Sequence, residues 1–369
     1  MKRRNFLLAL VATGLAPLTI AGASTAGHRL RFLGVRGNTD RHYFVSGIDA
    51  EGGIVFDLPL PDRAHAIAIH PSGEVAMVIA RRPGRFLQPV DLRHGRLLDP
   101  ISCSDQRHLY GHAVFSPDGN LLYTTENDFV TGRGVIAVRD ANAGYRQLGE
   151  FKSGGIGPHE LRLLDDGDTL VVANGGIRTH PDFDRTPLNL DRMQPSLTYI
   201  DRHGGRQIES RQLPASLHQN SIRHLAVGAG NRVCVAMQYQ GPGNEHPPLV
   251  ALHQRGEPLR LLTPPDGVLQ RMRNYCGSVC ADSSGNCFAV SSPRGDLTTF
   301  WSAGTGDYLG LARVKDGCGI ASGESAGEFL LSSGVGALYR YRIDDGKVIP
   351  LPMDQSADIL WDNHIVEVS

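Results

Sequence analysis

No charge of one sign dominates this sequence, because 37 Lys and Arg are matched by 38 Asp and Glu among its 369 residues. A nucleic-acid-binding surface usually needs a basic excess, so no nucleic-acid partner is expected. The H-E-x-x-H motif of metalloproteases and the P-loop are absent. No C-x2-C pair occurs among the six cysteines, which disfavours a thiolate metal site. We expect the cysteines to be small apolar core residues, with an occasional disulfide.

A long apolar run occurs only at the N-terminus, in MKRRNFLLALVATGLAPLTIAGASTAG. Its basic start and its small residues in Ala-x-Ala spacing predict a signal peptide over residues 1–26. Arg3-Arg4 followed by Asn5-Phe6-Leu7 favours twin-arginine export over general secretion, although Lys2 stands where that motif prefers Ser or Thr. No later run approaches the ~20 residues that span a bilayer. The sequence therefore predicts a periplasmic protein without a membrane span.

Glycine is abundant, at 44 residues, and it marks a repeat. Each unit is an apolar strand, a Gly turn and a second apolar strand, as in HAIAIHPSGEVAMVIA (65–80) and HAVFSPDGNLLYTTE (112–126). Similar units start at residues 159, 224, 277 and 318, and the last, NHIVEV, starts at 363. The spacing between most successive starts is near the ~40–45 residues expected for a four-stranded propeller blade. The sequence predicts an all-β fold, a seven-bladed β-propeller.

The last blade needs strands from both ends of the chain. The segments LRFLGVRG, HYFVSGID and GIVFDLPL supply three strands, and the C-terminal NHIVEV would supply the innermost fourth. This arrangement closes the blade and leaves no exposed sheet edge. We therefore expect residues 28–369 to form a single β-propeller domain.

Five of the predicted blades begin with a histidine, and these side chains should ring one mouth of the central channel. The candidate metal ligands are His65, His112, His159, Glu160, His224 and His364. Imidazole suits Fe, Cu and Zn. The alternative is structural, because a histidine at a blade entry often hydrogen-bonds within its own blade. The distance from each histidine to its turn glycine varies by up to two residues, so a bulge or a shorter turn must absorb the shift if all five are to face the channel.

A long polar loop, NGGIRTHPDFDRTPLNLDRMQPS (174–196), is expected on the same face. It is interpreted either as a solvated loop packed across the face or as a lid on the channel mouth. The candidate ligand-binding residues of this loop and its neighbours are Asn174, Arg178, His180, Arg81, Arg82 and Arg294. Their guanidinium groups favour a carboxylate or phosphate-like ligand.

Several segments resemble an exported bacterial family, the domain of unknown function 1513. They include GHAVFSPDGNLLYTTENDF, GIGPHELRLL, VVANGGIRTHPDFDR, SIRHLAV, SSPRGD and the terminal WDNH. The resemblance covers nearly the whole mature chain and implies a propeller of the YVTN/WD40-like type. It also implies a role near iron uptake, since genes of the family often lie beside those of imelysin-type iron-uptake proteins and a dihaem oxidoreductase-like protein. Those two proteins are the possible partners.

Three functions remain open. The first is a periplasmic propeller that binds a metal ion or metal complex, with Fe, Cu or Zn as candidates, as an accessory to metal uptake or redox handling. The second is an enzyme, either a metal-dependent oxidoreductase or a lactonase-like hydrolase, because seven-bladed propellers include both. The third is an interaction scaffold without a small ligand. Converging imidazoles would favour a metal, and imidazoles bonded within their blades would favour the structural alternative.

Overall fold

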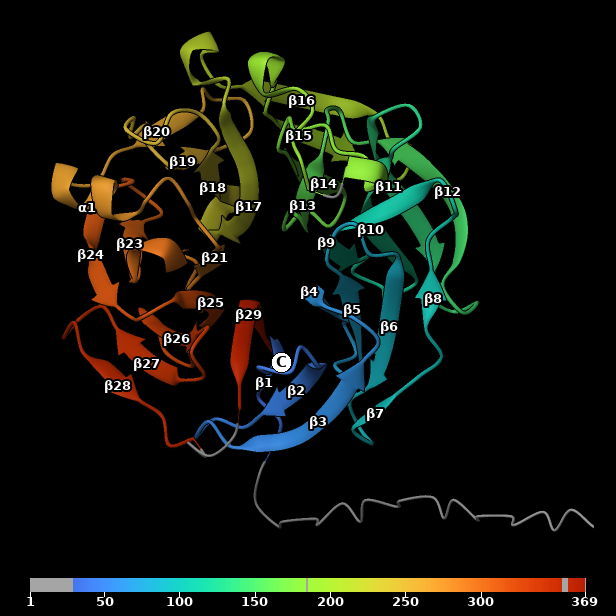
Figure 1. Ribbon diagram of the computed structural model, residues 1–369, viewed down its shortest axis with the longest axis horizontal. Helices are drawn as coiled ribbons and strands as arrows, with labels where there is room; N and C mark the ends of the chain where they lie inside the picture. Colours follow the sequence, from blue (N-terminus) through green and yellow to red (C-terminus); the bar gives the residue numbers. More distant parts are fainter. Residues whose placement is uncertain (1–28, 184, 354–357, 369) are drawn as a thin grey trace, which may run out of the picture.

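The computed structural model describes residues 29–183, 185–353 and 358–368, and the predicted signal peptide lies outside these ranges. Seven antiparallel sheets close into a ring around a central axis (Figure 1). The prediction of an all-β, seven-bladed propeller is confirmed. The α-helix α1 (Asp266–Arg271) has six residues, and no helix in the described ranges is long and apolar enough to cross a membrane.

Each blade is a meander of four strands, and its innermost strand lies next to the axis (Figure 1). The inner strands are β4 (Ala64–Ile69), β9 (Arg107–Phe115), β13 (Pro158–Leu163), β17 (Asn220–Gly228), β21 (Ser278–Ala281), β25 (Gly317–Ser322) and β29 (Leu360–Glu367). The second strands are β5 (Val75–Ala80), β10 (Leu121–Asp128), β14 (Thr169–Asn174), β18 (Arg232–Tyr239), β22 (Cys287–Ser292) and β26 (Glu328–Ser333).

The outer strands complete the blades. They are β6 (Phe86–Asp91), β7 (Arg96–Leu97), β11 (Arg133–Asp140), β12 (Arg146–Lys152), β15 (Ser196–Asp201), β16 (Gln207–Gln212), β19 (Val250–His253), β20 (Arg260–Leu262), β23 (Leu297–Ser302), β24 (Tyr308–Arg313), β27 (Leu338–Arg342) and β28 (Val348–Pro350). One blade gains a fifth strand, because β8 (Ile101–Ser102) also pairs with β6.

Apolar side chains fill the space between neighbouring blades. Leu33 and Val45 of one blade pack with Val78 and Val90 of the next, and all four are buried. Each buried aliphatic side chain of this size stabilises the fold by roughly 1.5–3 kcal/mol relative to an exposed one. The six cysteines are free thiols, and four of them are buried in these layers. The cysteines therefore serve as small apolar residues.

The two ends of the chain meet in one blade, as predicted. Its strand order is β29, β1 (Phe32–Gly37), β2 (Tyr43–Ile48) and β3 (Ile54–Leu60). The antiparallel register places Leu33 opposite Val366 and Gly34 opposite Ile365. Trp361 covers Gly34 so closely that a Cβ there would lie 2.8 Å from its ring. In Figure 1, β29 lies beside β1 and close to the axis.

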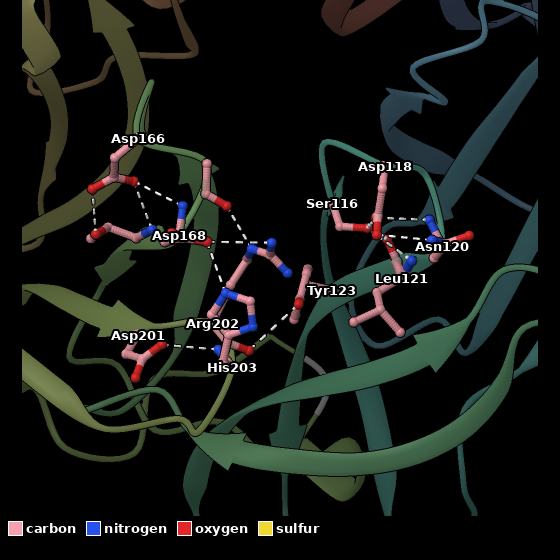
Figure 2. Close-up of polar contacts among 12 residues, drawn as sticks. Ser116, Asp118, Asn120, Leu121, Tyr123, Asp166, Asp168, Asp201, Arg202 and His203 are labelled. Atoms are coloured by element: carbon pink, nitrogen blue, oxygen red, sulfur yellow. Dashed lines mark hydrogen bonds and ion pairs between the residues drawn. The ribbon is translucent and has the colours of Figure 1, made fainter.

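Aspartates fix the hairpins between first and second strands, as Figure 2 shows for two neighbouring blades. Asp118 accepts hydrogen bonds from the Ser116 hydroxyl, the Asn120 backbone N–H (3.1 Å) and the Asn120 side-chain amide (2.8 Å). In the next blade, Asp166 accepts from the Thr169 hydroxyl at 2.7 Å. Such side-chain bonds to the local backbone hold a tight turn. The bonds from Ser116 and Asn120 lower the pKa of Asp118 from 3.8 to about 2.

This turn predicts how stability depends on acid pH. Because the pKa of Asp118 is lower in the folded than in the unfolded chain, its stabilisation is complete above pH ~4 and is lost as the pH falls through about 2. The thermal unfolding midpoint of Asp118→Ala should therefore fall less steeply than that of the wild type between pH 4 and 2. Asp99→Ala, at an exposed position, is the control and should keep the wild-type slope. Parallel curves for wild type and Asp118→Ala would refute the prediction.

Candidate metal centre

The inner strands that carry a histidine are irregular at or beside that residue. The irregular segments contain His65 in β4, Tyr110–His112 in β9, His159 in β13, Arg223 in β17 and Asp362–His364 in β29. A β-bulge shifts the alternation of side chains and re-aims the one it carries. The irregular segment of β9 absorbs the one-residue difference at His112, and the shorter turn after β17 (Ala229–Asn231) accounts for the difference at His224. All five imidazoles therefore reach the axis. Of the two inner strands without a histidine, β21 pairs with β22 without a register shift, whereas β25 has an irregularity between Gly317 and Ile320.

The five imidazole rings converge on the propeller axis. The ring centres of His65 and His364 are 4.6 Å apart, those of His112 and His364 4.7 Å, and those of His159 and His224 4.7 Å. Two imidazoles bound to one ion at ~2.0–2.1 Å place their ring centres about 5 Å apart, so these spacings suit a shared ion. The five side chains are 1–8% exposed.

Three overlapping sets of ligand atoms lie close enough to hold one ion. They are His65, His159 and His224; His65, His112 and His364; and His112, Glu160 and His224. Because the sets share His65, His112 and His224, one ion at the centre of the cluster would be within reach of several of them. The six metal-site residues predicted from the sequence are thus brought together.

Most imidazole nitrogens in the cluster have no hydrogen-bond partner among the described residues. The unpartnered atoms are both nitrogens of His65, Nε2 of His112, His224 and His364, and Nδ1 of His159. A buried polar atom left without a partner costs ~1–3 kcal/mol, so native proteins carry few of them. The structural alternative required histidines bonded within their own blades. The buried ring nitrogens that have no hydrogen-bond partner instead fit a bound ion.

Glu160 lies beside the cluster and orients two of the imidazoles. Its Oε2 atom accepts from Nδ1 of His224 at 3.0 Å and from the Leu225 backbone N–H at 3.3 Å. Its Oε1 atom lies 3.6 Å from Nδ1 of His112 and 2.6 Å from an Nη atom of Arg162. A carboxylate that binds Nδ1–H leaves the Nε2 lone pair free for a metal. Glu160 therefore acts best as the residue that positions the ligands.

Burial and neighbouring charges favour the protonation states that metal binding needs at Glu160, His112 and His65. Burial raises the pKa of Glu160, but the interactions with His112 and Arg162 outweigh it and hold that pKa below 4.5. Burial lowers the pKa of His112 from 6.5 to about 3, and burial and the neighbouring His364 lower that of His65 well below 6.5. A neutral imidazole is the form that ligates a metal.

Gly111 makes room for the cluster. It has a φ of +112°, and a Cβ at this position would lie 2.4 Å from Cδ2 of His65. Any larger residue would displace the His65 imidazole and strain the backbone. The close packing of β9 against His65 thus depends on glycine.

Cavities border the cluster from both directions along the axis. His65, His159 and His224 line a small cavity of about 60 Å³ beside the loops that precede the inner strands. His112 and His364 line a cavity of about 420 Å³ toward the other ends of those strands. The histidines therefore form a layer across the channel between these two spaces.

Two of the arginines predicted to bind a ligand reach the smaller cavity, and the other predicted residues lie elsewhere. Arg81 and Arg82 line it. Asn174 is bonded inside its blade, where it accepts from the Ser153 hydroxyl at 2.7 Å and donates to the Thr198 hydroxyl at 3.1 Å. Arg178 is exposed beside Gly132.

The remaining two candidates, His180 and Arg294, do not line this cavity and instead contact aromatic side chains. The His180 ring lies 5.4 Å from that of Phe129. Arg294 stacks on the outside of Tyr275, 4.3 Å from the ring centre, while Tyr275 itself lines the cavity.

Sequence reasoning missed several residues of this cavity, including Arg185, Arg223 and Tyr110. Arg223 directly precedes His224, and Arg185 lies in the long loop, where Arg178 and His180 were preferred. Arg185 donates to the backbone carbonyl of Arg82 at 3.1 Å, so this loop does cross to the channel mouth.

Sequence reasoning also overlooked a G-x-S-x-G sequence, GESAG at residues 323–327. In α/β-hydrolases this pattern forms a strand-to-helix turn that presents the serine. Here it lies in the hairpin between β25 and β26, with no helix after it, and Ser325 is exposed. The pattern therefore gives no support for a serine hydrolase.

Fold and site together define a class: a seven-bladed propeller with a buried polyhistidine cluster on its axis. The chain belongs to the family described as protein of unknown function (DUF1513), whose model matches residues 58–368. Comparison with curated proteins finds no match. Among solved structures, a hydrazine synthase chain from Kuenenia stuttgartiensis is similar, with a TM-score of 0.57 and 18% identity, over 86% of this chain and 94% of that one. This likeness shows the shared propeller fold alone.

Proposed function

We propose that this protein is a periplasmic metal-binding propeller that holds one transition-metal ion among its axial histidines and serves metal acquisition or redox handling. The observation that carries the proposal is the convergence of five imidazoles, most of whose ring nitrogens are buried and have no hydrogen-bond partner among the described residues. Iron, copper and zinc are the candidate metals, because each accepts imidazole ligands. Glu160 would orient His112 and His224 from behind, as carboxylates do for metal-bound histidines.

The N-terminal sequence supports this proposal in a second way. Arg3-Arg4 and the apolar run after it favour the twin-arginine route. That route carries folded proteins, and an ion enclosed by five inner strands would have to be in place before export. An imelysin-like or dihaem protein, which the family resemblance implies, would then meet the loaded propeller in the periplasm.

Elemental analysis tests the proposal directly. Untagged protein purified from the periplasm without chelator should contain about one equivalent of iron, copper or zinc. Adding that metal to the stripped protein at 100 times its Kd should stabilise the fold by ~2.7 kcal/mol, seen as a higher unfolding midpoint. A protein that is isolated without metal and whose midpoint responds to none of the three ions would refute the proposal.

A metal-dependent enzyme is the second candidate. It is favoured by the cavity of about 420 Å³ that reaches His112 and His364, because a small substrate could approach the ion there. An open coordination position next to a substrate-sized space is typical of catalytic metal sites. Turnover of a small redox substrate or a lactone by the metal-loaded protein, absent from the stripped protein, would establish this function.

A further inference from the structure

The small cavity next to the histidine cluster is surrounded by arginines. It is lined by Arg81, Arg82, Arg185 and Arg223, together with Tyr110 and Tyr275. These residues come from separate parts of the chain, including the loop after β5, the long loop after β14 and the bulge of β17. Four guanidinium groups around one small space form a strongly positive site.

Two of these arginines have no carboxylate partner in the part of the chain that the structure describes. Arg223 is only 5% exposed, and neither Arg81 nor Arg223 forms an ion pair with a carboxylate among the described residues. Asp362 lies on this side of the cluster, but it is paired with Arg63 and stands 4.0 Å from His65 Nδ1. Buried charges of one sign are costly unless a counter-charge is bound.

Unused hydrogen-bond donors point to the same conclusion. The Nε atom of Arg223 and the hydroxyl of Tyr110 are buried and have no hydrogen-bond partner in the described part of the chain. Both residues line the cavity. Guanidinium and hydroxyl donors that meet at one space suit an acceptor with several oxygens, and guanidinium binds planar oxyanions through paired hydrogen bonds.

We infer that this cavity is a binding site for a small oxyanion, of the size of carbonate or phosphate. Its volume of about 60 Å³ is several times the ~10–15 Å³ that a cavity needs to hold one water molecule, so it has room for a ligand larger than water. The site goes beyond the proposed metal binding and does not depend on it. Because His65, His159 and His224 border both sites, an anion here would lie next to a bound ion, and each would strengthen the binding of the other.

Calorimetric titration of the metal-free protein with sodium phosphate, in a buffer without other oxyanions, tests this inference. We expect one phosphate to bind per chain. Arg223→Gln and Arg81→Gln should each weaken phosphate binding at least ~10-fold, because each removes a charge-assisted donor. Arg192→Gln is the matched control, since Arg192 is an exposed arginine of the same long loop, and it should bind phosphate like the wild type.

Each outcome decides for or against the site. If Arg223→Gln fails to fold, Arg81→Gln gives the answer, because Arg81 is only half-buried. No phosphate binding by folded wild type, or equal binding by both cavity variants, would overturn the inference. Citrate binding that depends on Arg223 in the absence of phosphate binding would also overturn it, in favour of a larger polycarboxylate. Phosphate binding by a protein that takes up no metal would refute the proposed function and leave the anion site intact.

Discussion

His65→Leu is expected to abolish metal binding without destabilising the metal-free protein. His65 belongs to two of the three ligand sets, so its loss should weaken metal binding at least ~100-fold. Both its ring nitrogens are buried and without a partner, so replacing the ring with an apolar group of similar size removes two orphaned polar atoms. Metal content, the metal Kd and the free energy of unfolding of the stripped protein measure the two effects separately.

A second buried histidine provides the matched control. His253 is 2% exposed, and both its ring nitrogens are hydrogen-bonded. Its Nε2–H group donates to the Glu257 carbonyl at 2.8 Å, so Nδ1 of the neutral ring accepts from the Tyr199 hydroxyl at 2.6 Å. His253→Leu should therefore destabilise the fold by ~1–3 kcal/mol and leave metal binding unchanged. If His65→Leu instead lost stability like His253→Leu and kept its metal, the axial histidines would be structural.

Glu160→Gln should weaken metal binding by a factor of ~10–100 while every ligand remains in place. The amide keeps the size of the side chain but loses the charge that holds Nδ1 of His112 and His224. Its amide N–H group would also face one of the donors that surround Glu160, such as the Arg162 guanidinium. The imidazoles would then lose their fixed tautomer and orientation. The metal Kd, measured by competition with a chromophoric chelator, reports this loss.

Glu126→Gln is the control that distinguishes a loss of ligand positioning from a general loss of stability. Glu126 is also a fully buried glutamate with an arginine partner, Arg139 at 2.7 Å, but it lies in β10 and belongs to none of the ligand sets. Its substitution should lower the free energy of unfolding and leave the metal Kd as in the wild type. Equal metal Kd values for Glu160→Gln and the wild type would show that Glu160 does not position the metal ligands.

The fold could be predicted because each blade repeats one simple signal. An apolar strand, a glycine turn and a second apolar strand recur at blade spacing, and the starts predicted at 277 and 318 fall within one residue of β21 and β25. The closure by β29 followed from counting strands at the two ends. Periodicity of this kind depends on residue type alone and needs no knowledge of local backbone geometry.

The site was only partly predictable, for a physical reason. A histidine at the start of an inner strand is visible in the sequence, but a bulge is a backbone irregularity with no residue signature at His65 or His159. The same limit applies to the long loop. Arg178 and Arg185 have the same chemistry, and only the path of the loop brings Arg185 to the cavity and leaves Arg178 exposed.

The position of His364 has a consequence for the order of events during synthesis. Four histidines of the cluster lie between residues 65 and 224, whereas the fifth lies in β29, which follows all the other described strands in the chain. The full set of ligands cannot assemble until that strand docks against β1, which was made first. A chain cut short by a few dozen residues would lack both the closing strand and one ligand. In the proposed function, metal occupancy would thus report whether β29 has docked and the ring of blades has closed.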